Sequence, residues 1–218
     1  MLKKFVCCLV FAAIVLGTCF AEGGEADLSY AVGVLLGTDL KKSNFKLDYT
    51  VVAEAMRKTI ETDDPGMSEE SAALIVRNVL QIAQDKLARE NRAKSAVFLE
   101  ENAKKKNIQT TKSGLQYELI AQGDGAHVSL DTIVKVNYTG SLIDGSVFDS
   151  NAEDGGPAEI PLNRVIPGFA EGIALMQVGG RVKLFIPPDL GYGEEGAGEN
   201  IPPNAVLIFD VELLGTAE

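Results

Sequence analysis

Few side chains in this sequence could serve as nucleophiles or as sulfur and imidazole ligands for a metal. The cysteines are Cys7, Cys8 and Cys19, all near the start of the chain, and His127 is the single histidine. If the first 21 residues are removed, the mature chain has no thiol for a disulfide, a thiolate metal site or nucleophilic catalysis. A Ser-His-Asp triad would depend on His127, and no Gly-x-Ser-x-Gly motif accompanies it. Hydrolase chemistry is therefore disfavoured.

Two segments resemble ligand-binding motifs without meeting the structural requirements of those motifs. Residues 191–196 fit the G-x-G-x-x-G pattern, but a dinucleotide site needs a strand before the pattern and a helix at its end, whereas Pro187 and Pro188 come just before it. Residues 149–155 are similar to a calcium loop, but the glycine comes one position late and no flanking helix pair is predicted. Both segments are interpreted as loops.

The overall composition is that of an acidic protein with enough apolar residues for a core. The chain has 218 residues, of which 46% are hydrophobic, and its formal charge is −11. Because nucleic-acid affinity depends on Lys and Arg that neutralise phosphates, this balance excludes a basic nucleic-acid binder.

The first 21 residues are typical of an export signal. Two lysines precede an apolar run at residues 5–16, which is too short to span a bilayer, and residues 19–21 form a small-x-small cleavage site. We therefore expect export and cleavage after Ala21. The alternative is a lipid anchor at Cys19, because this cysteine and the residues before it are loosely similar to a bacterial lipobox.

The elements that must position any site begin with three predicted helices. Apolar residues recur at helical spacing over residues 27–43, and again from a cap at Asp48 to a break at residues 64–66. A third pattern runs over residues 68–106 without Gly or Pro, which predicts a helix too long for a small domain to bury. Residues 86–95 of this helix are mostly charged or small and are interpreted as a solvated spacer. Its first half has an apolar stripe, interpreted as dimer or intradomain core: Ala72, Ile75, Val76, Val79, Leu80, Ala83 and Leu87.

Beyond Gly114 the pattern changes to short β-branched or alternating runs separated by Gly and Pro. Strands are predicted near residues 115–120, 132–142, 181–186 and 206–214. A short amphipathic helix is predicted over residues 169–176, so we expect one sheet wrapped against one short helix. The chain is thus predicted to be α+β, with a signal peptide at 1–21, a helical domain at 22–67, a long connecting helix at 68–107 and a β-rich domain at 114–218.

Motifs in the β-rich part carry a resemblance to a known family. In chain order they are VNYTG at 136–140, DGSVFDS at 144–150, VIPG at 165–168, IPPDLGYG at 186–193, IPP at 201–203 and LIFDVEL at 207–213. In this order and spacing they resemble the FKBP family of peptidyl-prolyl cis-trans isomerases, over about residues 115–214. The helical part and the joining segment TKSGLQY at 111–117 resemble the bacterial subgroup that includes the macrophage infectivity potentiator. In that subgroup amino-terminal helices form a dimer and a long helix carries the isomerase domain.

The resemblance implies an antiparallel half-barrel and isomerisation of X-Pro bonds (EC 5.2.1.8) in a pocket without a metal or cofactor. It assigns Val165, Phe169 and Ile201 to substrate binding, and it places Asp149 near the prolyl carbonyl. The backbone N–H of Ile166 and the hydroxyl of Tyr192 would hold the flanking carbonyls of the substrate. The catalytic residues that it implies are Tyr138, Phe148, Asp149, Ile166, Tyr192 and Phe209.

The sequence departs from the usual family pattern at three places. Phe169 stands where most members have Trp, and Asp154 stands where many carry an Arg that faces the pocket Asp, so Asp149 is expected to lack that ion pair. The loop at residues 194–200 is acidic and glycine-rich.

The resemblance also implies partners and a location. They are unfolded or proline-containing exported polypeptides in the periplasm, a homodimer through the amino-terminal helices, and a macrolide inhibitor of the tacrolimus type; no nucleic acid is expected. The alternative function is an ATP-independent chaperone, a holdase that clamps unfolded chains and whose isomerase activity is weak or incidental.

Overall fold

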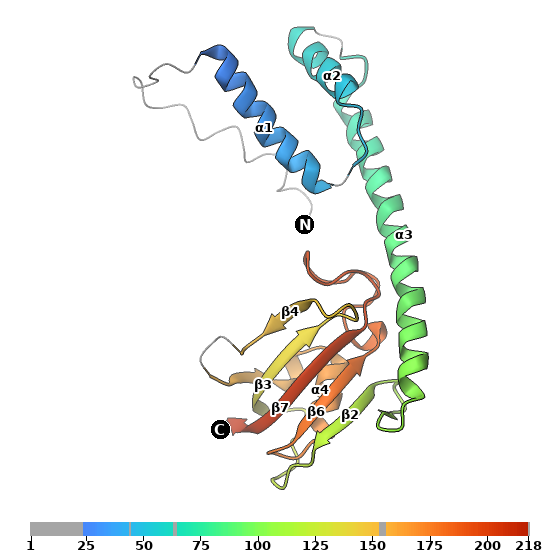
Figure 1. Ribbon diagram of the computed structural model, residues 1–218, viewed down its shortest axis with the longest axis vertical. Helices are drawn as coiled ribbons and strands as arrows, with labels where there is room; N and C mark the ends of the chain where they lie inside the picture. The colour runs from blue at the N-terminus through green and yellow to red at the C-terminus, as the bar shows by residue number, and fades with distance from the viewer. Residues whose placement is uncertain (1–23, 44, 63–64, 153–155, 218) are drawn as a thin grey trace. The chain divides into compact units, whose positions relative to one another are not determined.

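The computed structural model describes residues 24–43, 45–62, 65–152 and 156–217 (Figure 1). The predicted signal segment at residues 1–21, which includes Cys19, and also Asp154 lie outside this set. The chain divides into two compact units, with the boundary after Ser68. Within the described ranges, no helix has the length and apolar character needed to cross a membrane.

The first unit contains two helices, α1 (Glu25–Ser43) and α2 (Tyr49–Glu61). Asp48 caps α2, since its Oδ1 accepts hydrogen bonds from the backbone N–H groups of Thr50 (2.9 Å) and Val51 (3.3 Å). Both helices and this cap were predicted from the periodicity, and they are confirmed.

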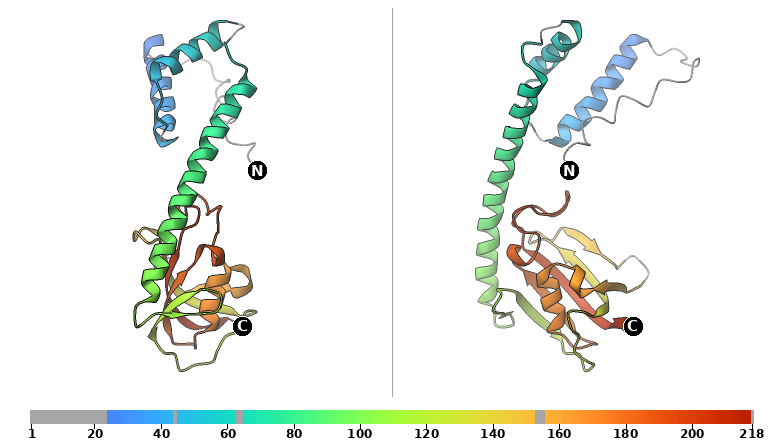
Figure 2. Two further views of the ribbon diagram at one scale, coloured as in Figure 1. Left: turned by 90° about the vertical axis from the view of Figure 1, so that its right-hand side faces the viewer. Right: turned by 180° about the vertical axis from the view of Figure 1, so that it is seen from behind.

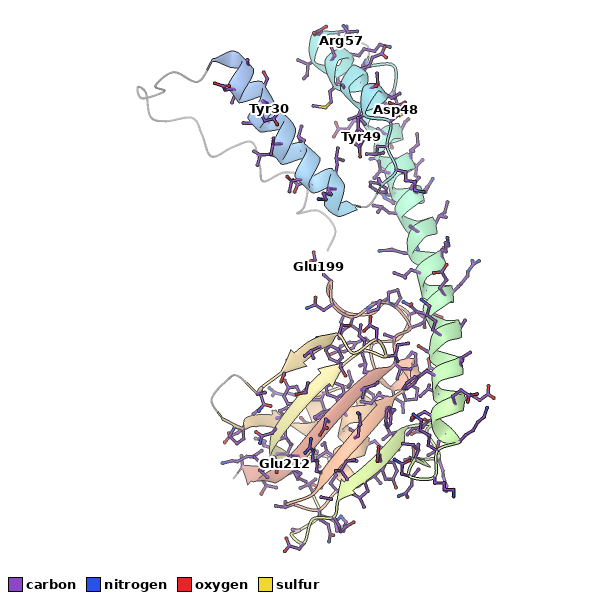
Figure 3. All side chains as sticks on the ribbon, viewed as in Figure 1. Tyr30, Asp48, Tyr49, Arg57, Glu199 and Glu212 are labelled. Carbon is purple, nitrogen blue, oxygen red and sulfur yellow. The ribbon has the colours of Figure 1, made fainter. Side chains whose placement is uncertain are left out.

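Much apolar surface on the helices is exposed in the single chain. Tyr30 on α1 and Tyr49 on α2, labelled in Figure 3, are 78% and 69% exposed. Helix α3 (Glu69–Ala103) has 35 residues and lies within the predicted range of residues 68–106. The apolar stripe on its first half is also exposed, for example at Ile75 and Val79. Apolar surface of this extent on a single chain indicates an interaction face.

The second unit contains α3 and an antiparallel sheet of seven strands. Their spatial order is β1-β2-β6-β7-β3-β4, and β5 pairs with β3 (Figure 1). The strands are β1 (Gln109–Thr110), β2 (Gln116–Ala121), β3 (Ile133–Ser141), β4 (Val147–Ser150), β5 (Ala158–Pro161), β6 (Arg181–Ile186) and β7 (Leu207–Ala217). The four predicted strands correspond to β2, β3, β6 and β7. We call residues 109–217 the β-rich domain.

One helix, α4 (Pro167–Ala174), packs against the sheet and encloses the core of the β-rich domain. Phe169 and Ile173 on α4 are buried there. A Cβ at Gly172 would lie 2.5 Å from the side chain of Leu184, so glycine permits the close approach of α4 to β6. Two short 3-10 helices, η1 (Leu162–Arg164) and η2 (Pro188–Leu190), flank this region. The predicted fold class, helices followed by an antiparallel sheet wrapped on a short helix, is confirmed.

The second half of α3 is buried on one face, whereas the sequence predicted a solvated spacer there. Ala88, Asn91, Ser95, Phe98 and Asn102 are partly or fully buried. They recur at intervals of three and four residues and therefore share one side of the helix, which we call the docking face. Figure 2 shows this half of α3 beside the β-rich domain. The prediction was wrong because this face is mainly polar or small, and a hydrophobic pattern does not reveal it.

Candidate functional site

A cleft of about 420 Å³ opens at one side of the β-rich domain. Strands β3, β4, β5 and β7, the start of α4 and the loop after η2 all contribute to its walls. Its lining residues are Tyr138, Asp149, Ile160, Arg164, Val165, Ile166, Phe169, Tyr192 and Phe209. Seven of the nine residues predicted for the site therefore line one cleft.

The floor of the cleft is an aromatic cluster centred on Phe209. Its ring centroid lies 5.1 Å from that of Phe169 and 6.2 Å from that of Tyr138. The ring of Tyr138 meets that of Phe169 edge-on at 6.2 Å. Such edge-to-face contacts contribute stability beyond area burial. Phe169 is 4% exposed, so the smaller ring that replaces the usual Trp is fully packed.

A polar pair lies at the edge of the cleft. Tyr138 Oη donates a hydrogen bond of 2.9 Å to Asp149 Oδ2 across the neighbouring strands β3 and β4. Tyr138 is held in turn by the buried Asn151, whose Oδ1 accepts from the backbone N–H of Tyr138 (2.7 Å) and whose Nδ2 donates to Val136 O (3.0 Å). Because β4 ends at Ser150, the Asn151 amide takes the place of a neighbouring strand at this point.

Phe148 and Ile201, the other two predicted site residues, pack beside the cleft and do not line it. The ring of Phe148 meets that of Phe209 edge-on at 5.5 Å. A Cβ at Gly140 would lie 2.7 Å from the Phe148 ring and 2.9 Å from the Phe209 ring, so glycine leaves room for both. Ile201 is 8% exposed and belongs to the hydrophobic core. Direct contact of Phe148 or Ile201 with substrate stays a prediction.

Two lining residues, Ile160 and Arg164, were not predicted. Ile160 lies in β5, where it pairs with Val134 on β3, and a run of four residues beside Pro161 gave little strand signal. Arg164 comes directly before the VIPG motif. Its place next to that motif was the one signal that could have assigned it to the cleft. Arg164 places a cation in the wall of the same cleft as Asp149.

A second groove, of about 520 Å³, is lined by polar residues of β3, β6 and β7. Its charged groups have polar partners within the groove. Arg181 donates to both carboxylate oxygens of Asp210 (2.8 and 3.0 Å), and Asn137 donates to Glu212 (3.1 Å). The contact with Asp210 raises the pKa of Arg181 above its ordinary value. These groups complement each other across neighbouring strands. We therefore interpret the groove as part of the sheet surface, where cross-strand pairs stabilise the sheet.

Among the residues that the structure describes, no cluster of three or more His, Cys, Asp and Glu side chains could hold a metal ion. The G-x-G-x-x-G segment follows η2 and contains turns with no helix at its end. The chemistry that the cleft can offer is an apolar surface, the Tyr138–Asp149 hydroxyl–carboxylate pair, the hydroxyl of Tyr192 and one guanidinium.

Two family models match most of the chain. Residues 125–214 match the model described as FKBP-type peptidyl-prolyl cis-trans isomerase, and residues 25–119 match the domain amino terminal to it. The probable isomerase FkpA of Neisseria meningitidis serogroup B is 43% identical over 196 residues, which cover 85% of this chain and 72% of the relative. The outer membrane protein MIP of Legionella longbeachae is 37% identical over 198 residues, which cover 86% and 83%.

A solved structure has the same arrangement of elements. The crystal structure of FkpA from Escherichia coli matches with a TM-score of 0.71 and 32% identity, over 89% of this chain and 97% of that one. The likeness includes the helices as well as the sheet, and seven of the nine predicted site residues line one cleft. The chain therefore belongs to the FKBP-type peptidyl-prolyl cis-trans isomerases.

Proposed function

We propose that this isomerase accelerates rotation about X-Pro bonds by taking the imide out of water into the aromatic cleft. Rotation faces a barrier of about 18–20 kcal/mol because resonance keeps the bond planar. Twisting removes resonance and reduces the carbonyl dipole, so an apolar site favours the twisted form more than water does. The observation that carries the proposal is the lining of the cleft, in which four rings converge: Tyr138, Phe169, Tyr192 and Phe209.

The few polar groups of the cleft would orient the substrate. Asp149, held at 2.9 Å by Tyr138 Oη, would lie near the prolyl carbonyl. The backbone N–H of Ile166, just before α4, and the hydroxyl of Tyr192 would hold the carbonyls on either side. This mechanism forms no covalent bond and needs no cofactor. The same cleft is the proposed site for a macrolide inhibitor.

Substitution of the orienting groups tests these roles. Asp149→Ala should lower kcat/KM about tenfold, because an interaction with a charged group contributes about 1.5–3 kcal/mol and 1.4 kcal/mol is a factor of ten. Tyr192→Phe should lower it about threefold. Cis-trans exchange on a Leu-Pro peptide, followed by NMR without a coupled protease, gives both values. Asp131→Ala removes another exposed carboxylate, in the turn before β3, and serves as the control. Unchanged rates in both site variants would contradict the assigned roles.

The proposed clients are exported polypeptides of the periplasm. Support comes from the sequence of residues 1–21, which has the character of an export signal. Uncatalysed prolyl isomerisation takes tens of seconds or more, so a compartment where chains fold benefits from the catalyst.

A homodimer formed through the amino-terminal helices, with holdase activity, is the second candidate function. The exposed apolar faces of α1, α2 and the first half of α3 favour it. Val79→Asp in the exposed stripe of α3 should convert a dimer to a monomer in analytical ultracentrifugation and leave turnover of short peptides unchanged. Asn78→Asp adds the same charge beside the stripe and should leave the dimer intact. A wild-type chain that sediments as a monomer would rule out this assembly.

A further inference from the structure

The docking face of α3 contacts the β-rich domain at both of its ends. At the carboxyl-terminal end, Asn102 Nδ2 donates to Gln116 Oε1 (3.0 Å), and the Phe98 ring lies 6.1 Å from that of Phe185. At the other end, Asn91 and Ser95 reach a single segment of the chain. That segment is the end of the cleft loop, which we define as residues 191–206.

Asn204 is the residue where helix and cleft loop meet. Its Nδ2 donates to Ala88 O (3.0 Å), and its own carbonyl accepts a hydrogen bond from Ser95 Oγ (2.7 Å). One residue earlier, Pro203 O accepts from Asn91 Nδ2 (3.0 Å). Asn204 is 3% exposed, so its side-chain N–H and its carbonyl oxygen depend on α3 for hydrogen bonds.

The backbone of Asn204 has a conformation that few residues adopt. Its φ of +54° lies in the left-handed region, and it is the one described non-glycine residue with a positive φ. Asn tolerates this region better than most residues, yet the conformation costs free energy that the surrounding contacts must offset. Residues held in this way are concentrated at sites where geometry matters for function.

Asn204 is connected to the cleft by one hydrogen bond across the base of the loop. Its backbone N–H donates to Gly193 O (2.8 Å), and Gly193 directly follows Tyr192 in the cleft wall. Further along, Ala197 and Ile201 exchange two backbone hydrogen bonds (2.9 and 3.1 Å) that close the loop as a hairpin. Glu199, labelled in Figure 3, lies in the turn of this hairpin. The orientation of the hairpin is therefore set at its base.

We propose that Asn204 is a positioning residue, which uses the docking face of α3 to fix the cleft loop and thereby the Tyr192 side chain over the bound prolyl peptide. The exposed Arg92–Glu194 ion pair (3.3 Å) joins the same two elements and contributes little, because both side chains are solvated. The long helix α3 thus fixes one wall of the active site as well as connecting the domains. This inference rests on the proposed role of the cleft.

The test uses the full mature chain and two asparagines of the same interface. Asn204→Ala removes the bond to Ala88 and disfavours the positive φ, whereas Asn204→Gly removes only the side chain. Asn102→Ala is the matched control, because Asn102 is as buried as Asn204 and belongs to the same interface, but it lies at the end of α3 that is remote from the loop. Each variant is measured for melting temperature, for kcat and KM on a Leu-Pro peptide, and for the ¹³C-labelled tyrosine ring signals.

Asn204→Ala should raise KM at most about threefold, the effect expected for Tyr192→Phe, with kcat little changed, because a misplaced hydroxyl weakens the binding of substrate and transition state alike. The Tyr192 ring signal, assigned from Tyr192→Phe, should shift or broaden while that of Tyr117 stays. Asn204→Gly and Ser95→Ala should change both quantities in the same direction by less. Asn102→Ala should lower the melting temperature but leave KM and the Tyr192 signal unchanged.

Equal melting temperatures for Asn204→Ala and Asn102→Ala, with KM and the Tyr192 signal unchanged in both, would overturn the inference and leave Asn204 a structural residue only. If Asn204→Ala does not fold, Asn204→Gly and Ser95→Ala decide the question by the same measurements. Failure of the proposed function looks different: Tyr192→Phe would leave turnover unchanged, while the Tyr192 ring signal would still report whether Asn204 fixes the loop.

Discussion

Phe209→Ala is expected to abolish measurable isomerase activity and to lower the free energy of unfolding by about 3–5 kcal/mol. The ring is 6% exposed and lies within 5.1–6.2 Å, centroid to centroid, of the rings of Phe169, Phe148 and Tyr138. Its removal leaves a cavity on the cleft floor, and water that enters it would again solvate the imide and so favour the planar form over the twisted one. Urea unfolding gives the stability, and NMR exchange on the Leu-Pro peptide gives the activity.

Leu213→Ala separates the loss of the cleft from the loss of stability. Leu213 lies on the same strand, is 0% exposed, and is not among the residues that line the cleft. Its truncation should cost about 2–5 kcal/mol, similar to Phe209→Ala, and leave activity nearly intact at a temperature where both variants are folded. Activity that falls equally in the two variants would mean that the aromatic floor has no special role in the reaction.

The parts of the fold that the sequence predicts well are those with long or chemically marked patterns. The 35 residues of α3 lack Gly and Pro, and Asp48 has the side chain that caps a helix. The strand at Arg181–Ile186 was predicted with its observed bounds, because its buried apolar residues are flanked by glycines and prolines. The cleft residues followed from the family motifs, since composition alone cannot distinguish an aromatic pocket from an aromatic core.

The features that the sequence did not predict either have no hydrophobic pattern or depend on residues far along the chain. β5 has four residues, and its position is set by pairing with β3, so Ile160 could not be placed in the cleft beforehand. The docking face of α3 was missed because Asn91, Ser95 and Asn102 are polar. Their burial is favourable only because carbonyl and amide partners from far along the chain meet them.

The docking face leads to a second prediction, which concerns the stability of an isomerase fragment without α3. A fragment of residues 109–218 keeps every strand of the β-rich domain, but it lacks the helix that packs on Phe185 and on the cleft loop. It loses the side-chain hydrogen bonds of Asn91, Ser95 and Asn102 and those made to α3 by Gln116 and Asn204. At about 1 kcal/mol net for each bond, the loss is a large part of the 5–15 kcal/mol that stabilises a typical domain.

A fragment of residues 82–218 keeps the whole docking face and is the matched comparison. The shorter fragment should melt at least about 10 °C lower, since 1 kcal/mol shifts the midpoint by roughly 2–8 °C in domains of this size. It should also bind the Leu-Pro peptide more weakly, because the cleft loop has lost its contacts with α3. Phe98→Ala in the longer fragment should fall between the two in calorimetry. Equal melting temperatures for the two fragments would mean that these contacts contribute no net stability, because the entropy lost in ordering the end of α3 offsets the bonds it forms.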